Sequence, residues 1–223
     1  MLTINDIKAA YEPLKNKSNQ KTMESYMKNN FPFLGIKKSE TAPIMKVLFK
    51  LGLPKTKDET KALVDDCFEQ PEREYHYIGM IILNKNEKQF DVTDLDYLKQ
   101  LILTHSWWDS IDTIAPNIVG RIVLREREAG EAVMRQWNQS DNFWLQRASL
   151  LHQLKYKAQM NEALLTEMIL HTKDEQEFFI RKAIGWVLRE YSKTNAEFVT
   201  TFVDTHALSP LSQREALKWL ERQ

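Results

Sequence analysis

The 223-residue chain has few of the residues that interrupt helices or cross-link a fold. It contains six glycines, seven prolines and a single cysteine, Cys67. One cysteine excludes an internal disulfide and any zinc site built from cysteines. Cys67 lies in the helical pattern Leu63-Val64-x-x-Cys67-Phe68, so we expect a buried thiol in the core.

Long apolar runs and several catalytic motifs are also missing. No run approaches the roughly 18 apolar residues of a membrane span, and the amino terminus has no basic segment followed by an apolar one. A Gly-rich phosphate loop, a His-Glu-x-x-His pair and a Gly-x-Ser-x-Gly elbow are absent, and the five histidines lack metal-ligand spacing. We therefore expect a cytoplasmic protein with no membrane partner, no metal and no cofactor.

Strand patterns are absent too, whereas apolar residues recur at spacings of three and four. The sequence predicts an all-α protein. Helix start signals are Thr56 with Glu59, Thr172 with Glu175, Thr93 with Asp96, and Ser209 before Pro210. The predicted helices span 3–16, 20–29, 40–50, 57–69, 72–84, 94–103, 107–124, 128–137, 141–156, 160–171, 176–191, 195–204 and 210–221.

The second half of the chain repeats a pattern. Phe143-Trp144-Leu145-Gln146-Arg147-Ala148 returns 35 positions later as Phe178-Phe179-Ile180-Arg181-Lys182-Ala183. This period is typical of an α-solenoid built from antiparallel helix pairs, whose concave face is a trough for an extended ligand. Because no Gly/Ser/Pro-rich linker divides the chain, we expect a single domain over residues 1–223.

The segment Ser106-Trp107-Trp108-Asp109-Ser110-Ile111-Asp112 places indole rings beside carboxylates. Trp108 and Asp112 are four residues apart, so they share one face of the predicted helix, and together they suit a cationic ligand. Ser106 and Asp109 are expected to cap that helix, which explains Asp109 without a function. Asp112 is too far inside the helix to cap it. Its structural alternative is a buried carboxylate bonded to a neighbouring arginine or to a tryptophan N–H.

Trp186 stands where the preceding repeat has Leu151, and Gly185 beside it permits a close approach to the helix. Trp137, Trp144 and Trp219 are expected to fill the core. A functional Trp186 and a packing role are both open on this pattern alone.

The net charge is zero, with 31 basic and 31 acidic residues, so only the distribution of charge is informative. Basic residues are frequent in the second half, and Arg147 and Lys182 occupy matching repeat positions. If they share one surface, a neutral protein can still bind a polyanion. The candidate phosphate-binding residues are Arg147, Lys155, Lys157, Lys182 and Arg189, although simple surface solvation is the ordinary role of such side chains.

Several long motifs carry a family resemblance. They are Ser-Trp-Trp-Asp-Ser-Ile-Asp at 106–112, Asp-Asn-Phe-Trp-Leu-Gln-Arg-Ala at 141–148, Gln-Leu-Lys-Tyr-Lys at 153–157 and Phe-Phe-Ile-Arg-Lys-Ala-Ile-Gly-Trp-Val-Leu-Arg-Glu-Tyr at 178–191. With the early segments 23–27 and 31–35, they resemble the AlkD-type DNA alkylation repair enzymes over nearly the whole chain.

The resemblance implies a DNA glycosylase of HEAT-like repeats that removes positively charged N-alkylated purines, chiefly 3-methyladenine and 7-methylguanine, from duplex DNA. It implies that Trp108, Asp112 and Trp186 form the catalytic cluster, and that Tyr26 and Arg147 hold the DNA backbone near the lesion. Such enzymes act without drawing the damaged base into a deep pocket. We expect a monomer that needs no cofactor.

Two other interpretations fit parts of the pattern. The first is a helical-repeat module that binds DNA or protein through the same face without catalysis. The second is a carbohydrate glycosidase with Asp109 and Asp112 as its carboxylate pair. The two acids are three residues apart on one helix, whereas carboxylates that flank a sugar bond usually come from different elements.

Overall fold

The computed structural model describes residues 1–222, which contain helices and connecting loops but no strand. The predicted all-α class is confirmed. The chain divides into two compact units, Met1–Phe90 and Asp91–Gln223. Each is described by itself, and the prediction of a single domain stays a prediction. No helix in the described part of the chain is long and apolar enough to cross a membrane.

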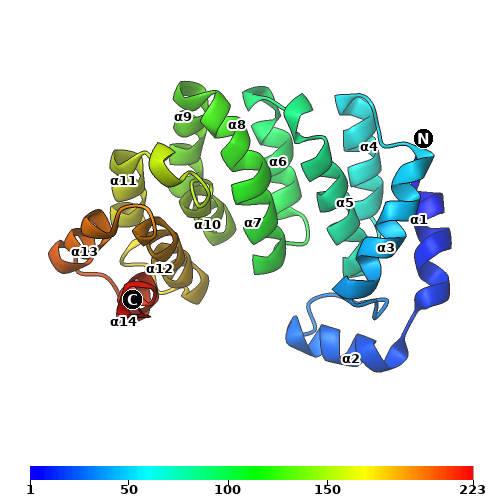
Figure 1. The fold of residues 1–223 in the computed structure, drawn as a ribbon, viewed down its shortest axis with the longest axis horizontal. Helices are drawn as coiled ribbons and strands as arrows, with labels where there is room; N and C mark the ends of the chain where they lie inside the picture. Colours follow the sequence, from blue (N-terminus) through cyan, green and yellow to red (C-terminus); the bar gives the residue numbers. More distant parts are fainter. Residues whose placement is uncertain (223) are drawn as a thin grey trace. The chain divides into compact units, whose positions relative to one another are not determined.

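The first unit contains five α-helices with three short 3-10 turns (Figure 1). The helices are α1 (Ile4–Tyr11), α2 (Lys17–Tyr26), α3 (Lys38–Leu48), α4 (Lys57–Phe68) and α5 (Arg73–Lys85), and the turns are η1 (Glu12–Leu14), η2 (Phe49–Leu51) and η3 (Glu87–Gln89). Helices α4 and α5 pack together. Cys67 of α4 is fully buried, as predicted, and burial raises the pKa of its thiol to about 12.

Glu74 fixes the segment that follows α2. Its buried carboxylate accepts hydrogen bonds from the backbone N–H groups of Leu34, Gly35 and Ile36 at 2.9–3.1 Å. The neighbouring Arg73 is fully buried, with its guanidinium carbon 4.0 Å from the centre of the Phe31 ring. A carboxylate that binds three backbone donors holds this loop in one conformation.

The second unit contains the remaining helices (Figure 1). They are η4 (Val92–Asp94), α6 (Leu95–Leu103), α7 (Trp108–Ile114), η5 (Ala115–Val119), α8 (Gly120–Arg125), α9 (Arg127–Asn138), α10 (Phe143–Leu151), η6 (Lys157–Gln159), α11 (Glu162–Thr172), α12 (Phe178–Ser192), α13 (Ala196–Thr205), α14 (Pro210–Leu217) and η7 (Leu220–Arg222).

These helices pack in two rows. In one row α7 contacts α10, α10 contacts α12 and α12 contacts α14, and in the other row α9 contacts α11. Contacts between the rows join α9 to α10, α10 to α11, α12 to α13 and α13 to α14. Each helix therefore buries its apolar face against its neighbours in the stack, which is how helical repeats form a continuous core. The repeated motifs at 143–148 and 178–183 begin α10 and α12.

Two predicted helix starts are confirmed and two are wrong. Thr56 caps α4 with Glu59 as its reciprocal partner, and Ser209 caps α14 ahead of Pro210. Thr172 instead ends α11, and the side chain of Glu177 caps α12. Thr93 lies inside η4, where the cap is supplied by Asp91. In both cases a nearby acidic side chain, and not the predicted threonine, accepts the hydrogen bond from a free backbone N–H group at the start of the helix.

The predicted helix 107–124 forms, but it contains an irregular turn. Ala115–Val119 is a π-helical segment between α7 and α8. Pro116 explains it, because proline has no N–H to donate to the carbonyl of Asp112 four residues earlier, and its ring would clash with that carbonyl. Such π-turns are frequent at functional sites. This one lies one turn after the candidate residue Asp112.

Candidate functional site

The side chains of Asp112 and Arg147 form an ion pair between α7 and α10. Arg147 Nε donates to Asp112 Oδ1 and Nη2 donates to Oδ2, both at 2.9 Å. The Arg147 side chain is 5% exposed and that of Asp112 is 16% exposed. The two parallel bonds match the planar fork of arginine to a carboxylate, which fixes the carboxylate plane. This contact is the structural alternative that the sequence left open for Asp112.

A third bond fixes the arginine itself. Arg147 Nη1 donates to the backbone carbonyl oxygen of Phe179, in the first turn of α12, at 2.5 Å. The Phe179 ring packs against the rings of Trp144 and Trp107, at centroid distances of 5.0 and 5.4 Å. Trp144 is buried, as its repeat position predicted. Thus α7, α10 and α12 meet at one guanidinium, backed by an aromatic cluster.

Burial shifts the pKa values of both members of the ion pair. Burial raises the pKa of Asp112 from 3.8 to about 6, and the attraction of Arg147 opposes that rise. Burial lowers the pKa of Arg147, and Asp112 opposes that change. An arginine remains protonated even after a considerable fall. At neutral pH both groups are therefore charged, and the carboxylate is the partner that acid would neutralise first.

The two candidate tryptophans lie on helices that form this site. Trp108 is the first residue of α7, one turn before Asp112, and is partly exposed. Trp186 of α12 is also partly exposed and lies two turns after Phe179. The predicted cap of α7 is wrong, because Ser106 Oγ donates back to the Ile102 carbonyl at 2.7 Å and α7 begins without a side-chain cap. Capping by Ser106 therefore does not explain Asp109.

Lys155 lies in the loop that follows α10, not in the predicted helix 141–156, and Lys157 is the first residue of the short 3-10 helix η6. Helix α10 ends at Leu151, and the chain turns so that Tyr156 is buried and its hydroxyl donates to the Gly120 carbonyl at 2.6 Å. Both lysines are exposed. Lys155 Nζ donates to Asn117 Oδ1 in η5 at 2.5 Å, which places this cation beside the π-helical segment that follows the helix carrying Asp112.

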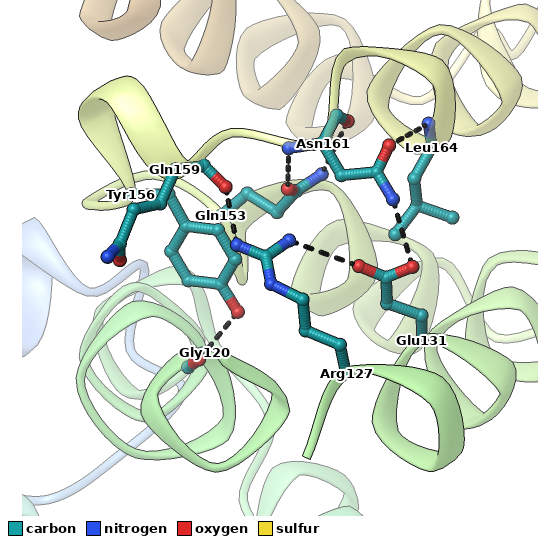
Figure 2. A network of polar contacts seen from close by, with 8 residues as sticks. All are labelled: Gly120, Arg127, Glu131, Gln153, Tyr156, Gln159, Asn161 and Leu164. Atoms are coloured by element: carbon teal, nitrogen blue, oxygen red, sulfur yellow. Dashed lines mark hydrogen bonds and ion pairs between the residues drawn. The ribbon is translucent and has the colours of Figure 1, made fainter. Parts of the chain in front are cut away.

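A polar network fixes the same loop (Figure 2). Arg127 of α9 donates to the Gln159 carbonyl at 2.6 Å and faces Glu131 at 3.4 Å. Glu131 accepts from Asn161, whose backbone N–H donates to Gln153 at 2.8 Å. The end of the loop is therefore attached to α9 through Gln159 and Asn161, and Gln153 joins the start of the loop to Asn161.

Lys182 and Arg189 of α12 are both partly exposed and both paired with Glu215 of α14. The matching repeat positions 147 and 182 therefore differ, because Arg147 is buried and Lys182 reaches solvent. Tyr26 is exposed at the end of α2 in the first unit. The described residues include no group of three or more His, Cys, Asp or Glu side chains that could hold a metal ion.

Sequence reasoning did not identify Phe179, which holds Arg147 through its backbone, or Glu215. A backbone carbonyl leaves no signal in the residue type, so Phe179 could not have been found. Glu215 could not have been found either, because Lys182 and Arg189, which pair with it, lie on another helix and become visible as its partners only in the fold.

The comparisons with known proteins agree with this architecture. The family model of the DNA alkylation repair enzymes matches residues 7–220. A solved structure from Enterococcus faecalis, described as a predicted DNA alkylation repair enzyme, is 32% identical and superposes with a TM-score of 0.86, covering 94% of this chain and 98% of that one. No curated protein matches the chain.

The all-helical architecture and these matches over nearly the whole chain define the class of the protein as a DNA repair protein. The chain belongs to the DNA alkylation repair enzyme family.

Proposed function

We propose that the protein is a DNA glycosylase that releases N3- and N7-alkylated purines from duplex DNA, with Asp112 as its central catalytic residue. The observation that carries the proposal is an ionised carboxylate held in a fixed plane, largely buried but still open to solvent. It lies on the helix that bears Trp108 and is joined through Arg147 to the helix that bears Trp186.

The chemistry of the substrate suits a carboxylate without a partner acid. An N-alkylated purine already carries a positive charge, so it leaves without protonation. The sugar becomes an oxocarbenium-like cation as the bond breaks. A carboxylate about 4 Å from that cation contributes roughly 4 kcal/mol at an effective dielectric constant near 20, against about 1 kcal/mol in water. Asp112 stabilises this cation and aligns the attacking water, a task in which fixed placement matters most.

The sequence predicts that Arg147 holds the DNA backbone, but in this proposal it has a different role. Three of its five N–H donors bind Asp112 and the Phe179 carbonyl, and its side chain is almost fully buried. We therefore assign to Arg147 the role of positioning Asp112, in preference to direct contact with a phosphate. The ion pair leaves further lone pairs on both carboxylate oxygens, which are available to a water or a sugar.

The tryptophans and the exposed cations complete the proposed site. Trp108 and Trp186 clamp the sugar and backbone, and an aromatic face against a cationic nucleotide adds about 0.5–2 kcal/mol. Tyr26, Lys155, Lys157, Lys182 and Arg189 contact the DNA backbone. The protein acts as a monomer and uses no cofactor.

The test is the release of free bases. Duplex DNA that contains 7-methylguanine or 3-methyladenine is incubated with the protein, and free bases are separated from the DNA by chromatography. The proposal predicts release well above the rate without protein. DNA binding without release would favour the non-catalytic helical-repeat module.

A further inference from the structure

Three cations surround one carboxylate where α12 meets α14. Glu215 Oε1 lies 3.1 Å from Lys182 Nζ and 3.9 Å from Lys218 Nζ, and Oε2 lies 2.7 Å from Arg189 Nη1. The Glu215 side chain is 9% exposed, against 35% for Lys182, 27% for Arg189 and 43% for Lys218. The acid is therefore the inner member of the cluster, and the cations extend from it toward solvent.

The backbone explains how Glu215 reaches this position. A Cβ atom added at Gly185 of α12 would lie 2.5 Å from Glu215 Cβ and 2.9 Å from the Ser212 carbonyl oxygen. Only glycine allows so close an approach. Ser212 Oγ also donates to the Arg181 carbonyl at 2.9 Å. The contact places Glu215 between Lys182, three residues before Gly185, and Arg189, four residues after it.

The cluster lies beside one of the proposed catalytic residues. Lys182, Trp186 and Arg189 follow each other at spacings of four and three residues, so they share one face of α12. A phosphate bound by these cations would therefore belong to the same DNA strand segment that Trp186 contacts.

The charges favour a further anion. Three cations and one carboxylate leave an excess of two positive charges, which Glu215 alone does not neutralise. Burial opposes ionisation of Glu215, but the bond from Lys182 and the attraction of Lys218 and Arg189 lower its pKa, so the acid remains charged. A lysine has three donors and an arginine five, and each cation uses only its inner side on Glu215.

We propose that Lys182, Arg189 and Lys218 form one binding site for a phosphate of the DNA backbone, and that Glu215 is its positioning residue. The proposal adds Lys218 and Glu215 of α14 to the DNA-binding surface. It rests on the proposed function only in taking DNA as the ligand.

Lys218→Gln tests the new cation. The probe is an unmodified fluorescent duplex, titrated at several salt concentrations. Loss of one phosphate contact should flatten the slope of log K against log salt by about 0.9 and weaken binding roughly fivefold to tenfold near 0.1 M salt. The matched control is Arg135→Gln, which removes one charge from an exposed ion pair between α9 and α11 and should leave both quantities unchanged. Equal behaviour of the two variants would overturn the proposal.

Glu215→Gln separates positioning from simple charge. Removing a negative charge near DNA should by itself tighten binding. If Glu215 holds the cations together, the nearly isosteric glutamine should instead weaken binding and flatten the salt slope, in a protein whose circular dichroism matches the wild type. Unchanged or tighter binding would refute the positioning role. Because the duplex is undamaged, a wild-type protein that released no bases would contradict the glycosylase and leave these results standing.

Discussion

At the scale of single residues, the pair of Asp112 and Arg147 is the feature that packing explains least. Buried ion pairs rarely stabilise a fold more than apolar residues of similar volume, because both charges lose their hydration. Here the carboxylate remains partly open to solvent while the arginine is almost fully covered. This asymmetry is what a site needs if one charge acts on a ligand and the other holds it in place.

The sequence identified Asp112 as exceptional, since it is the only ionisable residue between Ile111 and Val119. It named an arginine as one possible partner, but it did not join Asp112 to Arg147, which lies 35 residues later. That pairing depends on how α7 packs against α10, and no local pattern encodes it. The same limit applies to Glu215 and its three cations.

The first prediction concerns pH. Because the pKa of Asp112 is raised to about 6, the carboxylate is charged above that value and becomes neutral below it. Single-turnover release of 7-methylguanine should therefore fall as the pH is lowered from 8 to 5, with a midpoint near 6, after the rate without protein is subtracted. DNA affinity measured over the same range is the control. A rate that stays level or rises toward pH 5 would exclude an ionised Asp112 from the reaction.

The second prediction separates positioning from phosphate binding at Arg147. Arg147→Lys keeps the charge but loses the fork that holds both carboxylate oxygens. Base release should fall at least tenfold, on the order of the loss seen when catalytic geometry is disturbed, while the salt dependence of DNA binding stays unchanged. Lys155→Gln removes an exposed cation, so it should reduce the salt dependence of DNA binding and leave base release unchanged. Wild-type release by Arg147→Lys would show that the bidentate contact is dispensable.

At the scale of elements, most helices follow from periodicity, whereas their ends depend on local competition. Thr56 and Ser209 cap helices as predicted. Glu177 caps the helix predicted to start at Thr172, and Asp91 caps the one predicted to start at Thr93. The π-turn at 115–119 was missed even though Pro116 was visible in the sequence, because a proline inside a helix predicts a disturbance without specifying its form.

The third prediction concerns the contact of α12 with α14. Gly185→Ala gains up to about 1 kcal/mol of helix propensity, but the added methyl group overlaps Glu215 Cβ and the Ser212 carbonyl. Overpacking of this kind costs about 1–3 kcal/mol, so the overlap should prevail and lower the Tm by several degrees. Glu190→Ala on the same helix should change the Tm little. A Gly185→Ala protein as stable as wild type would mean that the helices separate at no cost.

At the scale of the whole molecule, the repeat of 35 residues predicts the stacked helices of the second unit. A regular period makes the packing of the helices predictable from the sequence, because each helix pair repeats the same contacts. The first unit repeats less clearly, and its Glu74 clamp on residues 34–36 depends on backbone donors that sequence patterns do not reveal.

The fourth prediction concerns cooperativity. The boundary between the units falls between Phe90 and Asp91, in a short connection from η3 to η4 without glycine, serine or proline. We expect residues 1–223 to unfold as one domain, in a single calorimetric transition that coincides with the loss of helical circular dichroism. Two separated transitions would assign each unit an independent fold.

The most direct test of the central claim compares the wild-type protein with Asp112→Asn on duplex DNA carrying 7-methylguanine. The asparagine preserves the shape of the side chain and removes its charge, so DNA affinity should be retained while base release falls by about a hundredfold or more, comparable to the loss of one preorganised electrostatic group. Circular dichroism and the measured affinity establish that the variant is folded. Release at the wild-type rate by folded, DNA-binding Asp112→Asn would contradict the proposal that this carboxylate drives the reaction.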